Sequence, residues 1–173
     1  MTERPRILVV GYGNPGRLDD GIGPAIAEAA AEAGLSNVTV ESNFQLNIED
    51  AADVAEHDIV IFADASVSAK APFEFSRVEP KREGSFTTHS VRPAGVMALA
   101  QEEFGSKASG YVLAVPGEAF DDFGEELSPT ARQRVQAAAA FLRRLLEGAR
   151  DQSAFDAAAA EHHRSTSART NGM

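Results

Sequence analysis

Two short apolar runs, Ile7–Val10 and Ile59–Phe62, constrain the fold of this chain more than any other feature. Each is rich in β-branched residues, which predicts a buried strand. Between them the pattern predicts a helix over about Ile22–Ala33 and a second strand at Val38–Glu41. Strands that alternate with helices favour a sheet covered by helices on both faces. Right-handed crossovers then make these three strands parallel.

The same alternation continues through residues 1–150, which we expect to form a single α/β domain. The last helix of this domain is expected to begin near Pro129, with Ser128 as its N-cap. The other predicted elements are a helix at Ile48–Glu56, a strand at Asp58–Ala63, an edge strand at Phe73–Val78, a helix at Pro93–Phe104 and a strand at Tyr111–Val115.

The composition changes after Gly148, where the chain becomes rich in Ala, Ser, Thr, Arg and His. Phe155 is the only large apolar residue that could anchor this segment. We therefore expect residues 151–173 to form a disordered C-terminal tail, with His162 and His163 solvated.

Charge and composition narrow the range of partners. The chain has 173 residues and a formal net charge of −10, which disfavours nucleic acid because the phosphate backbone is also negative. No apolar run approaches the roughly 20 residues of a membrane span. The absence of cysteine excludes disulfides, thiolate metal sites and cysteine nucleophiles, and fits a cytoplasmic protein.

The loop after the first strand contains Gly11-x-Gly13-x-x-Gly16, which matches the dinucleotide-binding fingerprint. Glu41 even ends the second strand at a suitable distance for a ribose contact. The context argues against a cofactor, because a dinucleotide loop should lead at once into a helix N-terminus. Here an arginine and two aspartates intervene, and carboxylates there would repel a diphosphate.

Three aspartates follow predicted strands. Asp19 and Asp20 lie in the first loop, and one of them is expected simply to cap the helix, as aspartate does well. Asp64 follows the third strand, where it could also belong to an Asx-turn. If the strand order is 2-1-3, Asp20 and Asp64 converge beyond the carboxyl ends of neighbouring strands, where α/β sheets bind ligands.

His89 completes a set of two carboxylates and one imidazole. It lies in a polar loop before a helix, whereas His57 precedes the third strand on the opposite edge. Such a set suits a borderline divalent metal such as nickel or zinc, and it lacks a third strong ligand. No serine lies in a Gly-x-Ser-x-Gly elbow, which disfavours a serine hydrolase.

Several segments together resemble the hydrogenase maturation proteases, the peptidases that process the large subunits of [NiFe]-hydrogenases. The resemblance covers about Arg6 to Glu147. The segments that carry it are Gly11-x-Gly13-Asn14, Asp19-Asp20-Gly21-x-Gly23, Ala63-Asp64-Ala65, Thr87-Thr88-His89, Val115-Pro116-Gly117-Glu118 and Leu127-Ser128-Pro129-Thr130.

The resemblance implies a three-layer α/β/α fold of the phosphorylase/hydrolase-like type. Its five-stranded, mostly parallel mixed sheet has one antiparallel edge strand, which would be Phe73–Val78 here. The resemblance also implies that Asp20, Asp64 and His89 are both the catalytic and the metal-contacting residues. They would recognise nickel already installed in the large-subunit precursor, before a C-terminal extension is removed.

The incomplete ligand set suggests that nickel arrives with the substrate and completes its own coordination. Zinc or cadmium is expected to substitute in vitro, and the enzyme is expected to be a cytoplasmic, monomeric, aspartic-type endopeptidase. Alternatives remain open: a non-catalytic chaperone of the precursor, a dinucleotide-binding protein, and peptidyl-tRNA hydrolase, which Gly13-Asn14-Pro15-Gly16 also resembles. The last of these needs a basic face, which the charge disfavours.

Overall fold

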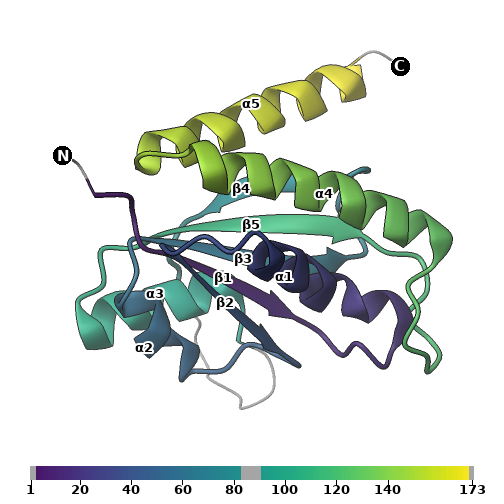
Figure 1. Ribbon diagram of the computed structural model, residues 1–173, viewed down its shortest axis with the longest axis horizontal. Helices are drawn as coiled ribbons and strands as arrows, with labels where there is room; N and C mark the ends of the chain where they lie inside the picture. The colour runs from purple at the N-terminus through teal and green to yellow at the C-terminus, as the bar shows by residue number, and fades with distance from the viewer. Residues whose placement is uncertain (1–2, 83–90, 172–173) are drawn as a thin grey trace.

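The computed structural model describes residues 3–82 and 91–171, with side chains described as far as His162. Strands and helices alternate along most of the chain (Figure 1). Their bounds are β1 Ile7–Tyr12, the 3-10 helix η1 Leu18–Gly21, α1 Ile22–Glu32, β2 Val38–Asn43, α2 Asp50–Ala55, β3 Ile59–Ser66, β4 Glu74–Val78, α3 Pro93–Phe104, β5 Ser109–Pro116, α4 Pro129–Gly148 and α5 Gln152–Asn171.

The strands form one five-stranded sheet in the order β2-β1-β3-β5-β4. β1 pairs in parallel with both β2 and β3, and β3 pairs in parallel with β5. β4 lies at the edge and pairs with β5 in the antiparallel direction. The predicted 2-1-3 order and the single antiparallel edge strand are both confirmed. The loops after β1 and β3 therefore leave the sheet side by side at its carboxyl edge.

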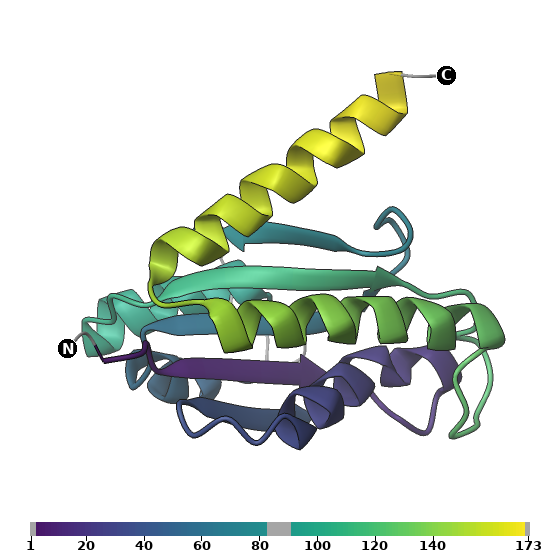
Figure 2. The ribbon, with the colours of Figure 1, turned by 45° about the horizontal axis from the view of Figure 1, so that its top comes forward.

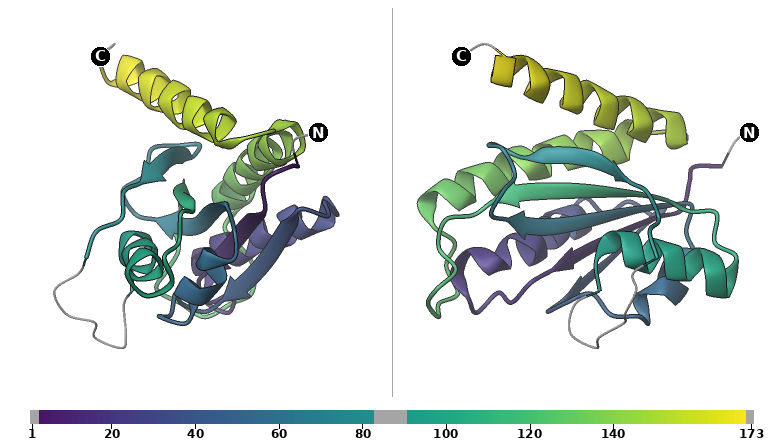
Figure 3. Two further views of the ribbon diagram at one scale, coloured as in Figure 1. Left: turned by 90° about the vertical axis from the view of Figure 1, so that its left-hand side faces the viewer. Right: turned by 180° about the vertical axis from the view of Figure 1, so that it is seen from behind.

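Helices cover both faces of the sheet (Figure 3). On one face, Val9 of β1 packs in a core with Ile26 of α1 and Leu142 of α4. On the other, Val10 packs with Val54 of α2 and Val96 of α3. Successive residues of a strand point to opposite faces, so a fully apolar strand is the expected consequence of two covered faces. None of the helices in the described ranges combines the length and apolar character of a membrane span.

The expectation of a disordered tail is wrong, because residues 152–171 form helix α5. Figure 2 shows its first turns packed beside α4 and β4 while its far end projects beyond the sheet. Phe155 is fully buried and lies 5.7 Å from the ring of Tyr111. Asp156 accepts hydrogen bonds from the Tyr111 hydroxyl at 2.6 Å and from Arg77 at 2.9 Å. His162, expected to be solvated, stacks on Phe73 with ring centroids 5.1 Å apart.

Replacing Phe155 by alanine should lower the free energy of unfolding by about 3 kcal/mol, because it leaves a cavity against Tyr111. Urea denaturation measures this change. Phe104→Ala is the matched control, since Phe104 is 55% exposed and its loss should cost little. Equal effects of the two substitutions would show that α5 contributes no core packing.

Candidate active site

Glycines let the loop after β1 fold tightly against its own chain. A Cβ on Gly13, whose φ is +138°, would lie 2.0 Å from the backbone oxygen of Asp20, and one on Gly11 would lie 2.2 Å from that of Gly23. The short helix η1 also separates this loop from α1. The space in which a diphosphate would approach a dinucleotide loop is thus filled by the protein itself, and the dinucleotide alternative is not favoured.

Asp19 is a structural residue rather than a helix cap. Its carboxylate is fully buried and accepts hydrogen bonds from the backbone N–H groups of Glu118, Ala119 and Ser128 at 2.7–3.0 Å, and from the Ser128 hydroxyl at 2.8 Å. Burial raises the pKa of Asp19, but these hydrogen bonds outweigh burial and hold it below its ordinary value. The loop after β1 is thereby fixed to the loop after β5 and to the start of α4.

Asp20 points the other way and is half-buried. One of its carboxylate oxygens accepts a hydrogen bond from the backbone N–H of Asn14 at 2.7 Å. The residue lines a cavity of about 270 Å³ together with Arg17, Phe120 and Asp121. The neighbouring aspartates therefore divide two tasks: one holds the loop in place, and the other is presented to solvent.

Asp64 lies within β3 rather than after it, because β3 continues to Ser66 in register with β5. Its carboxylate is half-buried and hydrogen-bonds the side chain of Tyr12 and the backbone N–H of Ala65. Burial and the nearby charge of Asp20 raise the pKa of Asp64, whereas the hydrogen bonds from Tyr12 and Ala65 lower it, and the net result is a pKa of about 6. A carboxyl group with this pKa can hold or release a proton near neutral pH.

The structure therefore brings together two of the three predicted site residues, Asp20 and Asp64. His89 lies outside the described residues, so its place in the site stays a prediction. Tyr12 is a contributor that the sequence analysis missed. Gly11 pairs with Ala63, so the next residues, Tyr12 and Asp64, extend neighbouring strands side by side. This register was the signal that could have revealed it. Burial, then the negative charge of Asp64 and the hydrogen bond to it, raise the pKa of Tyr12, which keeps its hydroxyl protonated.

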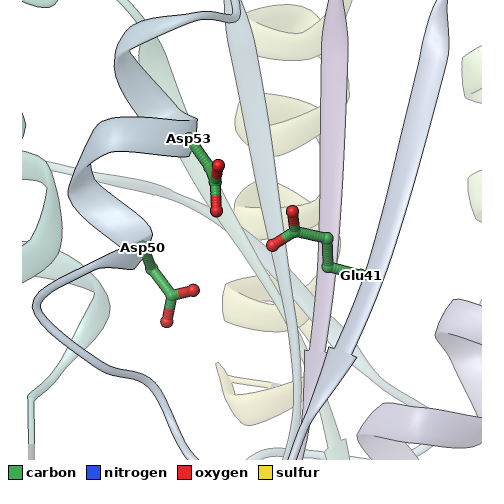
Figure 4. Close-up of side chains that lie close together, drawn as sticks. All are labelled: Glu41, Asp50 and Asp53. Atoms are coloured by element: carbon green, nitrogen blue, oxygen red, sulfur yellow. The ribbon is translucent and has the colours of Figure 1, made fainter.

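A second group of carboxylates lies across β2 and α2. Glu41, Asp50 and Asp53 each offer an oxygen within 4.8 Å of the others, and Figure 4 shows them turned toward one another. Burial raises the pKa of Glu41, and the negative charges of Asp53 and Asp50 raise it as well. Such a group could hold a hard divalent cation. Asp50 accepts hydrogen bonds from the backbone N–H of Asn47 and the side-chain amide of Asn43. Glu41 thus faces α2, not a ribose.

Exposed apolar side chains gather near the carboxyl edge of the sheet. Phe44 follows β2, Val67 follows β3 and Phe123 lies in the loop after β5, with exposed fractions of 72%, 87% and 82%. All three belong to segments that leave the edge at which Asp20 and Asp64 meet. Large exposed apolar groups around a site are typical of surfaces that bind another protein.

The arrangement of strands, helices and edge loops is that of known proteins. A [NiFe] hydrogenase maturation protease HycI from Thermococcus kodakarensis superposes with a TM-score of 0.65 and 24% identity, over 83% of this chain and 93% of that one. The chain has the fold of the hydrogenase maturation proteases. The hydrogenase maturating endopeptidase HybD from E. coli gives a TM-score of 0.61 and 25% identity, over 79% and 89% of the two chains.

A hydrogenase 2 maturation peptidase from a Thaumarchaeota archaeon also shares the maturation protease fold, with a TM-score of 0.58 and 20% identity over 82% of this chain and 97% of that one. No protein-family model and no curated protein sequence matches the chain significantly. The structural neighbours confirm the resemblance that the sequence motifs indicated. Of these motifs, the ones around Asp20 and Asp64 follow β1 and end β3, at the carboxyl edge of the sheet.

Asp19→Asn should lower the free energy of unfolding by about 3 kcal/mol, because an amide cannot accept all the hydrogen bonds that the buried carboxylate receives. Asp122→Asn, an exposed change in the loop that Asp19 holds, is the matched control. Urea denaturation of both variants tests the role of Asp19. Equal stability of the two would rule out the anchoring role.

Asp64→Asn should become more stable relative to the parent as pH rises. The folded protein binds the Asp64 proton more tightly than the unfolded chain, since the pKa is raised from 3.8 to about 6. The free energy of unfolding of the parent therefore falls as pH rises from about 4 to above 6, whereas the variant has no carboxyl group at this position and is not affected in this way. The free energy of unfolding of Asp64→Asn minus that of the parent should grow by about 2 kcal/mol between about pH 4 and pH 8. Unfolding curves at both pH values measure it, and a constant difference would contradict the raised pKa.

Proposed function

We propose that this protein is an endopeptidase that removes the C-terminal extension of a nickel-loaded [NiFe]-hydrogenase large-subunit precursor. The observation that carries the proposal is that Asp20 and Asp64 lie near the carboxyl edge of a maturation protease fold, close enough for the charge of Asp20 to raise the pKa of Asp64. Two structural neighbours are themselves named as a hydrogenase maturation protease and a hydrogenase maturating endopeptidase.

The chemistry of the site supports hydrolysis. Asp64 has a pKa of about 6, so its carboxyl group can exchange a proton with a water molecule or a leaving amine at neutral pH. Tyr12 holds this carboxyl group in position through its hydroxyl. The exposed side chains of Phe44, Val67 and Phe123 around the same edge fit a substrate that is a folded protein.

Nickel enters this proposal as part of the substrate. Asp20 and Asp64 offer two oxygen ligands, and we assign the third position to His89. Two carboxylates and one imidazole leave coordination positions open, which ligands from the precursor can fill. Cleavage would then follow only after nickel insertion, because the metal holds the scissile segment against the enzyme. Zinc or cadmium should support the same contact in vitro.

Incubation of the purified protein with the nickel-loaded precursor should shorten the precursor by the mass of its extension, as measured by mass spectrometry. Asp20→Asn and Asp64→Asn should each lower the cleavage rate by about 100-fold or more. Asp122→Asn, which removes an exposed carboxylate, should cut at the parental rate. A metal-free precursor should remain uncut.

The outcomes separate the endopeptidase from a chaperone that only binds the precursor. An unchanged precursor mass together with tight binding would favour the chaperone and contradict the proposed endopeptidase activity. Equal cleavage of nickel-loaded and metal-free precursor would leave a peptidase but remove the role of nickel.

A further inference from the structure

Strand β2 leaves one of its sides open. It pairs with β1, and in the described parts of the chain no strand lies on its other side (Figure 1). The backbone N–H of Ile7 donates to Asn37 and that of Gly13 donates to Asn43. In a parallel ladder bonds to one neighbour come from alternate residues, so Thr39, Glu41 and Asn43 face β1. The N–H and C=O groups of Val40 and Ser42 therefore point away from the sheet.

A groove runs along this open side. Its volume is about 600 Å³, and apolar surface dominates it. Val40 and Ser42 of β2 form one wall, and Ala27 and Ala31 of α1 form the other. The groove continues to Pro15 and Gly21, which flank the loop that carries Asp20. Gly21 directly follows Asp20 in the chain, so this end of the groove lies next to the loop of the candidate active site.

The charges around β2 are of one sign. Glu28 and Glu125 are the only ionisable residues that line the groove in the described structure, and both are acidic. Glu41 and Asp53 lie on the opposite face of β2, where further acidic groups gather. A strand added to β2 would place its alternate side chains over these two faces. Both faces therefore favour a segment with basic residues and small apolar ones.

We propose that an extended segment of the hydrogenase large-subunit precursor docks as an additional strand on β2, with alternate side chains in the groove. This inference rests on the proposed function and names the mode of substrate binding at that site. Added strands gain affinity from main-chain hydrogen bonds and specificity from pockets for alternate side chains, and β2 with its groove supplies both.

Hydrogen–deuterium exchange of the intact protein, with and without the nickel-loaded precursor, tests the docking. Exchange of residues 38–43 should slow in the complex, because the N–H groups of Val40 and Ser42 become hydrogen-bonded. Residues 74–78 of β4, the other edge strand, are the internal reference and should keep their exchange rates.

Two substitutions test the contacts themselves. Val40→Pro removes an outward N–H without removing a bond to β1, so it should weaken precursor binding by about tenfold while the protein stays folded by circular dichroism. Glu28→Lys should weaken binding of the precursor more than Glu32→Lys does. These two changes alter the net charge equally at exposed positions of the same helix, and only Glu28 lines the groove.

The possible results are distinct. A precursor that is bound and cleaved with no protection of β2, and with equal binding by Glu28→Lys and Glu32→Lys, overturns the docking mode and leaves the proposed function intact. A precursor that is neither bound nor cleaved overturns the proposed function and the docking mode with it. Protection of β2 that depends on protein concentration without precursor shows that a second copy of the chain occupies the edge, and overturns the assignment to the precursor.

Discussion

The buried carboxylate of Asp19 is the interaction on which the arrangement of the edge loops depends. It has no solvent-exposed surface, and its charge is balanced by hydrogen bonds from the segment that begins at Glu118 and ends at Ser128. A buried charge without such partners would be very costly, so these two loops must stay together. Asp20, the next residue, is thereby held at the carboxyl edge with little freedom to turn away.

The second carboxylate reaches the edge by a different route. Asp64 is part of a strand, and its position follows from the parallel register of β1 and β3. Burial and the hydrogen bond to Tyr12 then set its surroundings. A loop residue fixed by hydrogen bonds and a strand residue fixed by register are both rigid, which is what a site must be to orient a reacting group.

The remaining surface suits a large partner better than a small molecule. The site cavity beside Asp20 is small, whereas apolar side chains such as Phe44 and Phe123 stand exposed along the same edge. The open side of β2 extends this surface away from the site. A protein that must recognise a folded precursor needs such area, because affinity for a protein comes from many contacts around a few anchors.

The sequence alone determined the local elements, the parallel order of the first three strands and the aspartates near their carboxyl ends. These depend on short-range periodicity and on the handedness of crossovers, which neighbouring residues reveal. Only the tertiary structure decided that Asp19 is buried while Asp20 is presented, that Tyr12 contacts Asp64, and that residues 152–171 form a helix. Each of these depends on partners more than 40 residues away, and composition carries no record of such contacts.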